Sequence, residues 1–322
     1  MATVFLNGAF VAQDDARLSA FDASIQHGVG LFETMLGAAD GSAALRHHPE
    51  AGPGARVFRL EQHLDRLIGS ARDLGLSSDL RRDALGQAVL TTVARSGLAR
   101  ARVRLTLTGG DLNLLGRKPT RPGGERPAPV QPTIMIVAQP ATEYPDDMFE
   151  RGVSAVIADL KLNPLDQMAG HKTINYWGRL RELQVAAAKG AGEALVFQVT
   201  NFLAGGCVSN AFIVRDGELW TPIARGEEGD GQSGRTGVPV PSPVLPGITR
   251  AWLAAWAEER GLRIVRRMVN IEDVLGADEA FLTNSSWGVL PVVRLEKEQI
   301  GSGEVGEITS LAREAWLAAA QT

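Results

Sequence analysis

The segment DQMAGHKTINYWGRLRELQVAAAKGAGEALVF, residues 166–197, decides how the rest of the chain is interpreted. Its spacing predicts a helix from about Thr173 to Lys189 and then a strand in EALVFQV, with Lys172 at the start of the helix. Most lysines are solvated surface residues, so Lys172 taken alone indicates no chemistry. Its meaning depends on the segments around it.

Outward from this segment, strands and helices follow one another without regular βαβ alternation. Asn7-Gly8 predicts a hairpin, because both residues tolerate the positive φ of a type I′ turn. We expect strands in residues 101–108, 133–139, 152–160 and 210–222, a helix in 57–76 with Arg59 at its entry and Gly75 at its stop, and a helix in 246–262 that ends at Gly261. This mixture favours the α+β class over a doubly wound sheet.

The length of 322 residues suggests two domains. We expect an N-terminal α+β domain in residues 1–138, a linker in 139–149, and a C-terminal α+β domain in 150–322 that carries Lys172. Two Pro- and Gly-rich segments, GRKPTRPGGERPAPVQP and ARGEEGDGQSGRTGVPVPSP, indicate solvated insertions whose purpose the sequence does not reveal.

Composition and charge exclude several classes of partner. The formal net charge of −4 supplies no basic field for nucleic acid, and no long apolar run indicates a membrane segment. The single cysteine, Cys207, excludes an internal disulfide and a cysteine-based zinc cluster, which suits a cytoplasmic protein. The five histidines show no convincing metal-ligand spacing, so we expect no metal and a small-molecule partner.

Motifs for other common chemistries are missing from the sequence. There is no G-x-x-x-x-G-K-[ST] phosphate loop, no G-x-G-x-x-G between a strand and a helix, no G-x-S-x-G and no H-E-x-x-H. Nucleotide phosphate transfer, serine hydrolysis and metal hydrolysis therefore lose support.

Read together, eight blocks give the chain a resemblance that covers nearly its whole length. They are FLNGAFV, QHGVGLFETM, VFRLEQHLDRL, HKTINYWGRL, GEALVF, SNAFIV, LPGITR and DEAFLTNSSWGVLPV. In this order they resemble the fold-type IV pyridoxal-phosphate enzymes, which include branched-chain and D-amino-acid aminotransferases and aminodeoxychorismate lyases. The resemblance implies the two-domain class IV aminotransferase-like α+β fold, pyridoxal 5′-phosphate as cofactor, amino-acid and 2-oxo-acid substrates, and a homodimer with its site close to the subunit interface.

The resemblance also assigns roles to single residues. Lys172 would form the Schiff base with the cofactor and move the α-proton, since a lysine near other positive charge or out of water loses its proton more easily. Arg59 would pair with the cofactor phosphate through its planar fork. The backbone N–H groups of Ile248 and Thr249 would bind the same phosphate at a helix start, and so would the hydroxyl of Ser285, which could instead stabilise its turn.

The resemblance also suggests roles for Tyr176 and Thr34. Tyr176 stands four residues after Lys172, where it would approach the cofactor ring or be a packed core tyrosine. Thr34, in LFETM, stands where the lyase branch has a threonine near the substrate, although this block also occurs in aminotransferase-like relatives.

One position departs from the family pattern. The family has a glutamate five residues before the asparagine of SNAF, where it hydrogen-bonds the ring nitrogen of the cofactor, and here that position is Gly205. A charge-assisted hydrogen bond contributes about 1.5–3 kcal/mol, so its loss would slow deprotonation roughly ten- to a hundredfold. Another acid could reach the nitrogen, the reaction could need less electron withdrawal, or catalysis could be lost.

We therefore expect an amino-acid aminotransferase that works through Lys172. The alternatives are an aminodeoxychorismate lyase, which would release pyruvate and 4-aminobenzoate, and a catalytically silent protein that binds pyridoxal phosphate. The sequence specifies neither the amino acid nor the configuration of its α-carbon.

Overall fold

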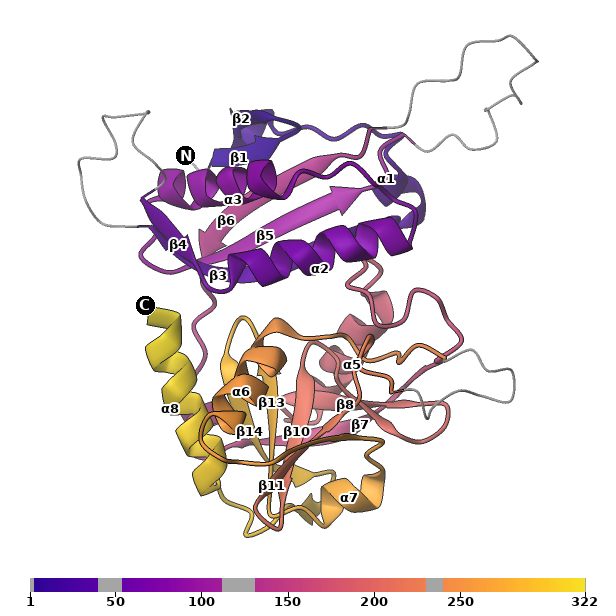
Figure 1. The fold of residues 1–322 in the computed structure, drawn as a ribbon, viewed down its shortest axis with the longest axis vertical. Helices are drawn as coiled ribbons and strands as arrows, with labels where there is room; N and C mark the ends of the chain where they lie inside the picture. The colour runs from indigo at the N-terminus through magenta and orange to yellow at the C-terminus, as the bar shows by residue number, and fades with distance from the viewer. Residues whose placement is uncertain (1–2, 40–53, 112–130, 230–239, 322) are drawn as a thin grey trace. The chain divides into compact units, whose positions relative to one another are not determined.

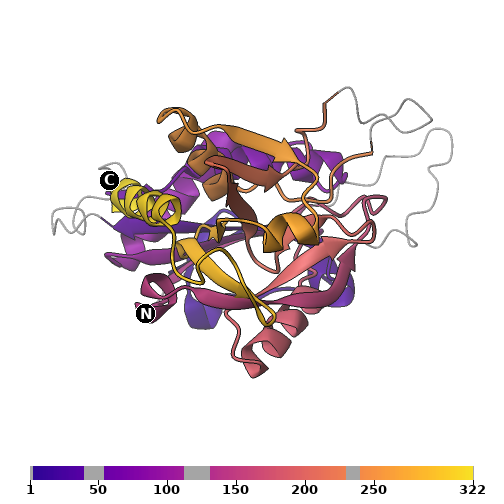
Figure 2. The same cartoon turned by 90° about the horizontal axis from the view of Figure 1, so that it is seen from below.

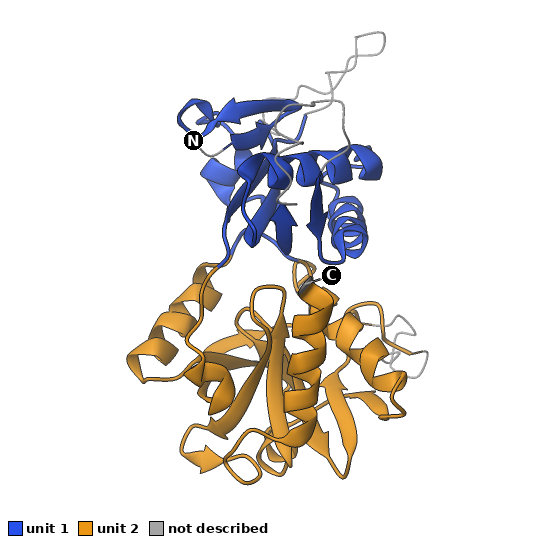
Figure 3. Ribbon diagram, turned by 90° about the vertical axis from the view of Figure 1, so that its left-hand side faces the viewer, with its two compact units in different colours: residues 1–141, 172–175 blue, residues 142–171, 176–322 orange. Residues whose placement is uncertain are grey.

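The computed structural model describes residues 3–39, 54–111, 131–229 and 240–321, and it divides into two compact units (Figure 3). Unit 1 comprises residues 1–141 and 172–175, and unit 2 comprises residues 142–171 and 176–322. The boundary after Ala141 falls inside the expected linker of residues 139–149. Lys172–Asn175 group with unit 1, whereas the sequence placed them in the second domain.

Unit 1 is built on a six-stranded antiparallel sheet in the order β2-β1-β6-β5-β3-β4 (Figure 1). The strands are β1 (Thr3–Leu6), β2 (Ala9–Ala12), β3 (Gly30–Ala39), β4 (Ala55–Val57), β5 (Ala101–Thr108) and β6 (Ile134–Pro140). The predicted hairpin between β1 and β2 is confirmed, since Leu6 pairs with Ala9 and both Asn7 and Gly8 have positive φ, at 49° and 92°.

Helices α2 (Leu60–Asp73) and α3 (Arg82–Ser96) cover one face of this sheet (Figure 1). The apolar residues of α2 recur at helical spacing, so Leu64, Leu67 and Ala71 all lie in one buried cluster with Leu31 and Met35 of β3. The opposite face of β3 therefore carries the alternate residues. A 3-10 helix (Gln13–Asp15) and the short α1 (Ala23–His27) connect β2 to β3.

Unit 2 contains a nine-stranded mixed sheet in the order β12-β11-β10-β13-β14-β7-β8-β9, with β15 paired to β14. The strands are β7 (Val153–Leu162), β8 (Glu193–Gln198), β9 (Leu203–Gly206), β10 (Asn210–Arg215), β11 (Glu218–Pro222), β12 (Ile264–Arg267), β13 (Glu279–Asn284), β14 (Gly288–Leu295) and β15 (Glu298–Gln299). The pairs β11–β12, β14–β7 and β7–β8 are parallel, and the others are antiparallel.

This sheet curls around its own core. Leu203 of β9 and Ile213 of β10 belong to the same buried cluster although β9 is the last strand of the sheet, and the Gly206 N–H donates to the Ser209 carbonyl at 3.0 Å. The helices are α4 (Asp147–Glu150), α5 (Trp177–Ala188), α6 (Ile248–Glu258), α7 (Ile271–Leu275) and α8 (Glu307–Gln321). Helix α5 packs on β7 and β8, and α8 packs outside β13 and β14 (Figure 2).

Both units combine helices with sheets that are mainly antiparallel, so the predicted α+β class is confirmed. One predicted boundary is wrong: the helix expected from about Thr173 begins at Trp177. Residues 172–174 are extended instead, because their backbone pairs with β3. Most of the two predicted insertions lies outside the described residues.

Candidate active site

Lys172 is fixed along the edge of β3 in unit 1. The Phe32 N–H donates to the Lys172 carbonyl at 2.9 Å, and the Ile174 N–H donates to the Gly30 carbonyl at 3.0 Å. Gly30 permits this approach, since a Cβ at that position would lie 3.1 Å from the Ile174 side chain and 2.7 Å from the Leu107 carbonyl oxygen. The backbone of Lys172 is therefore held by a strand rather than by a helix.

The Lys172 amine lies against one aromatic ring. Its Nζ is 4.5 Å from the centroid of Phe32, and the guanidinium carbon of Arg104 is 3.8 Å from the same centroid. Thr34, two residues beyond Phe32, pairs with Arg104 and points to the same face of the sheet. Lys172, Thr34 and Arg104 thus gather at the sheet face opposite α2 and α3. The sequence analysis missed Arg104, although alternate arginines in ARVRLTLT put Arg102 and Arg104 on one face.

Arg59 caps the start of α2 in a strained conformation. Its φ of 54° and ψ of 39° lie in the left-handed region, which residues with a Cβ rarely adopt. Such strain persists where the surrounding structure imposes it, and it is concentrated at functional sites. The His63 N–H donates to the Arg59 carbonyl at 3.2 Å, so the first turn of the helix holds this residue.

After Arg59 in the chain, α2 contributes to a buried charged cluster that joins it to β3. Glu33 accepts from Arg66 Nε at 2.9 Å and from Arg66 Nη2 at 2.6 Å, and its Oε2 lies 2.7 Å from His63 Nδ1. Burial would raise the pKa of Glu33, but the charge of Arg66 and the contact with His63 outweigh it and lower the pKa to about 2. Burial lowers the pKa of His63 and, together with the nearby charges of Arg66 and Lys172, outweighs the contact with Glu33, which raises it. Glu33 is thus ionised.

The sequence analysis missed this cluster. Glu33 is the middle residue of FET in β3, and His63 and Arg66 stand three apart on the face of α2 that packs on the sheet. The alternation of β3 could have indicated that Glu33 points inward with Leu31 and Met35.

In unit 2, helix α6 presents its N-terminus just after Gly247. Ile248 and Thr249 are its first two residues, so their N–H groups have no partner within the helix. In the part of the chain that the structure describes, the Thr249 hydroxyl is also buried without a hydrogen-bond partner, and the residue is 2% exposed. A buried orphan hydroxyl beside unpaired N–H groups fits an oxyanion such as phosphate.

Two contacts hold the turn before α6 in place. Asn210 Nδ2 donates to the Leu245 carbonyl at 2.8 Å. Asn210 Oδ1 would lie 1.8 Å from a Cβ at position 247, so only glycine fits there. Gly247 of LPGITR therefore allows the backbone to lie against Asn210.

Arg250 fastens the first turn of α6 to β11 and to the edge of the second insertion. Its Nε donates to Thr221 Oγ1 at 3.0 Å, and its Nη atoms donate to Glu227 at 2.8 and 2.7 Å and to the Pro222 carbonyl at 2.9 Å. Burial would raise the pKa of Glu227, but its bonds with Arg250 lower it. The pair thus stays charged and fixes the helix start.

The other residues predicted for the site lie in unit 2. Tyr176 is the N-cap of α5, and its ring centroid lies 5.7 Å from the Arg179 guanidinium carbon. Ser285 follows β13 in a turn in which Asn284 Oδ1 accepts from the N–H groups of Ser286 and Trp287. Gly205 lies in β9.

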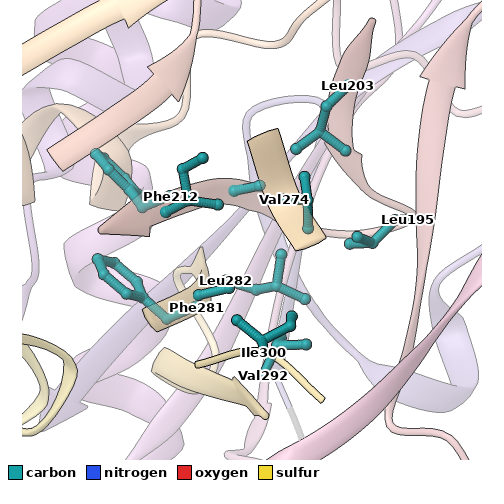
Figure 4. A pocket seen from close by; sticks show the side chains of 11 residues that line it. Leu195, Leu203, Phe212, Val274, Phe281, Leu282, Val292 and Ile300 are labelled. Carbon is teal, nitrogen blue, oxygen red and sulfur yellow. The ribbon is translucent and has the colours of Figure 1, made fainter. Parts of the chain in front are cut away.

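An apolar pocket elsewhere in unit 2 does not suit a polar substrate (Figure 4). It lies within the core enclosed by the curled sheet, and aliphatic and aromatic side chains such as Leu203, Phe212 and Ile300 line it. It offers no group that could bind a carboxylate or phosphate.

No three His, Cys, Asp or Glu side chains among the described residues are grouped to hold a metal ion. Nor does any described helix combine the length and apolarity that a membrane crossing requires.

Comparison with known proteins identifies the family. The family model for class IV amino-transferases matches residues 30–295. A putative branched-chain-amino-acid aminotransferase of Methanocaldococcus jannaschii is 30% identical over 97% of this chain and 94% of its own. Among solved structures, the Escherichia coli branched-chain aminotransferase is 24% identical with a TM-score of 0.79, covering 98% of this chain and 93% of that one.

The fold is also similar to that of a lyase. The structure of 4-amino-4-deoxychorismate lyase from Pseudomonas aeruginosa is 26% identical with a TM-score of 0.75, covering 98% of both chains. The family match extends over most of the chain, from the start of β3 to the end of β14. The chain is thus an enzyme of the class IV aminotransferase family, whose members are pyridoxal-phosphate-dependent aminotransferases and lyases.

Proposed function

We propose that the chain is a pyridoxal-phosphate-dependent aminotransferase that transfers the amino group of an amino acid to a 2-oxo acid. The observation that carries this proposal is the position of Lys172. Its backbone is hydrogen-bonded to β3, and its amine lies 4.5 Å from the centroid of the Phe32 ring. Thr34 and its cross-strand partner Arg104 lie on the same face of the sheet as Phe32. A lysine held in this way offers its amine at one defined point.

Lys172 binds the cofactor in this proposal and then carries the substrate α-proton. When bound, the cofactor draws electrons away from the α-carbon of the substrate. The positive charge of Arg104 beside the same ring suits the carboxylate of an amino acid, because a guanidinium forms paired bonds with planar oxygens. Thr34 lies on the same sheet face and contacts the substrate.

Candidate groups for the phosphate of the cofactor are assigned within each unit separately. In unit 2 they are the N–H groups of Ile248 and Thr249 and the hydroxyls of Thr249 and Ser285, and in unit 1 the candidate is Arg59. The orphan Thr249 hydroxyl supports this assignment, because a buried polar group without a partner costs about 1–3 kcal/mol unless a ligand satisfies it. Tyr176 is assigned to the cofactor ring.

A lyase is the second candidate. The likeness to the 4-amino-4-deoxychorismate lyase structure and the TNSSWGVLP block support it. A lyase would use Lys172 for the same proton but release pyruvate rather than exchange the amino group. The two reactions therefore differ in their products rather than in the residues named here.

We also propose that the chain forms a homodimer. Three large apolar side chains of unit 2 are exposed to solvent: Trp177 is 78% exposed, Leu165 75% and Leu180 49%. Exposed apolar surface is typical of a subunit interface. Sedimentation of Trp177→Arg against wild type tests this, with a shift towards the monomer expected.

Visible absorbance tests the main proposal. Wild type, Lys172→Ala and Lys189→Ala are mixed with pyridoxal phosphate, and then amino acids and 2-oxo acids are added. Lys189 is an exposed lysine at the end of α5 and serves as the matched control. We expect an absorbance band in wild type and Lys189→Ala that Lys172→Ala lacks, and amino transfer that requires a 2-oxo acid.

Other outcomes separate the alternatives. Pyruvate and 4-aminobenzoate formed from aminodeoxychorismate would replace the aminotransferase with the lyase. A band that depends on Lys172 but responds to neither substrate class would show a silent binder. A band that survives Lys172→Ala would refute the assignment of the lysine.

A further inference from the structure

The backbone at Gly205 is shaped for a residue without a side chain. Its φ is +142°, a conformation that L-residues rarely adopt. A Cβ at this position would lie 2.6 Å from the Ser209 carbonyl oxygen, and its three nearest neighbours are all backbone atoms. The position that carries a glutamate in the family cannot carry one here unless the backbone moves.

Glu193 is the acid that contacts the residues after Gly206, and both of its carboxylate oxygens already accept hydrogen bonds. Glu193, at the start of β8, accepts from Ala194 N–H at 3.0 Å and Cys207 N–H at 3.2 Å through Oε1. Its Oε2 accepts from Val208 N–H at 3.4 Å and from the Ser209 hydroxyl at 3.1 Å. A carboxylate has about four lone-pair sites, so these four donors leave Glu193 no site for a ligand.

Cys207 supplies no negative charge either. The thiol lies in an apolar cluster at 0% exposure, and burial, together with the nearby Glu193, raises its pKa to about 12. It is therefore a neutral thiol at any pH at which an enzyme of this kind works.

Besides Glu193, whose oxygens already accept hydrogen bonds, a cation binds this strand end. Arg179, in the first turn of α5, donates from Nη1 to the carbonyls of Cys207 at 3.0 Å and Gly206 at 3.3 Å. Its guanidinium also lies 5.7 Å from the ring centroid of Tyr176, the residue proposed to face the cofactor ring. A nearby positive charge disfavours protonation of a basic nitrogen.

We infer that the described residues around Gly205 give the ring nitrogen of pyridoxal phosphate no carboxylate partner, that Arg179 supplies a positive charge there instead, and that the nitrogen stays unprotonated in the loaded protein. The inference rests on the proposed function. It concerns the ring nitrogen alone and leaves Lys172 and the phosphate groups as assigned. Its consequence is a weaker electron sink, which favours reactions that need little stabilisation of a carbanion.

Two measurements on the full-length protein test it. The first is the ¹⁵N NMR shift of pyridoxal phosphate labelled at the ring nitrogen and bound to wild type at neutral pH, where we expect the shift of an unprotonated pyridine. The second compares the Kd of pyridoxal phosphate with that of its deaza analogue, in which carbon replaces the ring nitrogen. We expect equal affinities, whereas a charge-assisted hydrogen bond would make the analogue about ten- to a hundredfold weaker.

Arg179→Gln removes the charge and leaves a shorter, neutral side chain that still has an N–H donor. We expect it to raise the proton affinity of the ring nitrogen about tenfold. Arg181→Gln is the matched control, because Arg181 lies on the same helix with its side chain 62% exposed, and it should leave the ring unchanged.

The possible results are distinguishable. A protonated nitrogen in wild type, or an analogue bound tenfold or more weakly, would overturn the inference while the Lys172-dependent band still supports the proposed function. An Arg179→Gln protein with an unchanged ring titration would refute the role of Arg179. Absence of the band in wild type would overturn this inference and the proposed function together.

Discussion

Replacement of Gly205 by alanine should destabilise unit 2 far more than an ordinary glycine substitution. The new Cβ would be forced into a φ of +142° and placed 2.6 Å from the Ser209 carbonyl oxygen. The conformational strain is about 2 kcal/mol. Displacing the Ser209 carbonyl would also weaken its hydrogen bond from Gly206 N–H, which contributes about 1 kcal/mol. We therefore expect Gly205→Ala to lower the free energy of unfolding by about 3 kcal/mol.

Gly217→Ala is the matched control. Gly217 also has a positive φ, at +75°, and it lies in unit 2, but nothing stands within 4 Å of its Cβ position. Only the left-handed strain applies there, so the expected loss is about 1 kcal/mol. Gly205→Glu should be destabilised at least as much as Gly205→Ala and should not behave as a restored family enzyme.

Urea unfolding followed by tryptophan fluorescence suits this comparison. All six tryptophans lie after residue 176, so the signal reports unit 2 and is insensitive to the transition of unit 1. If Gly205→Ala and Gly217→Ala unfold with the same free energy, the steric argument fails. A Gly205→Glu protein as stable as wild type would refute it more directly.

The other predictions concern Glu33, Thr249 and Cys207. Glu33→Gln should lower the free energy of unfolding by about 3–5 kcal/mol, because it leaves the charge of Arg66, whose side chain is 10% exposed, without its carboxylate partner. The control Glu61→Gln, at an exposed ion pair, should change the free energy of unfolding little. The pKa of Glu33 in the folded protein, about 2, lies below its ordinary value of 4.5. Its ionised carboxylate therefore contributes about 3 kcal/mol to the free energy of unfolding above pH 4.5, and this contribution is lost as the pH falls towards 2. Urea unfolding of Glu33→Gln at a series of pH values should not show this loss. Thr249→Val should weaken binding of pyridoxal phosphate about tenfold by titration without lowering stability, because the removed hydroxyl has no protein partner among the described residues. Cys207 should resist a thiol reagent in the folded protein and react only in denaturant, since the thiol is buried and its pKa is raised to about 12.

Local signals in the sequence predicted the helix starts that carry the residues proposed to bind the phosphate. Helical spacing after Arg59 indicated α2, and the Pro-Gly before Ile248 indicated the start of α6, which begins at that residue. In both cases the helix start is encoded by residues that are neighbours in the chain. Site residues that depend only on a helix start can therefore be located from sequence.

Residues that depend on distant pairing could not be located in this way. The segment from Lys172 to Ile174 continues the helical pattern of α5, but the ladder with β3 makes it extended, and its partner Phe32 lies 140 residues earlier. Glu33 looks like a solvated acid in FET until the packing of α2 brings Arg66 to it. Tertiary pairing overrides local propensity at these positions.

The departure at Gly205 belongs to the whole turn that follows it rather than to one side chain. Gly206 leaves room for Glu193, since a Cβ there would lie 2.9 Å from the Glu193 carboxyl carbon. Glu193 in turn binds the N–H groups of Cys207 and Val208, and the backbone that they fix brings the Ser209 carbonyl against position 205. A chain that had lost the glutamate by one substitution alone would keep a backbone conformation there that any L-residue could adopt. Because this backbone accepts only glycine, a carboxylate side chain at position 205 requires rebuilding the turn.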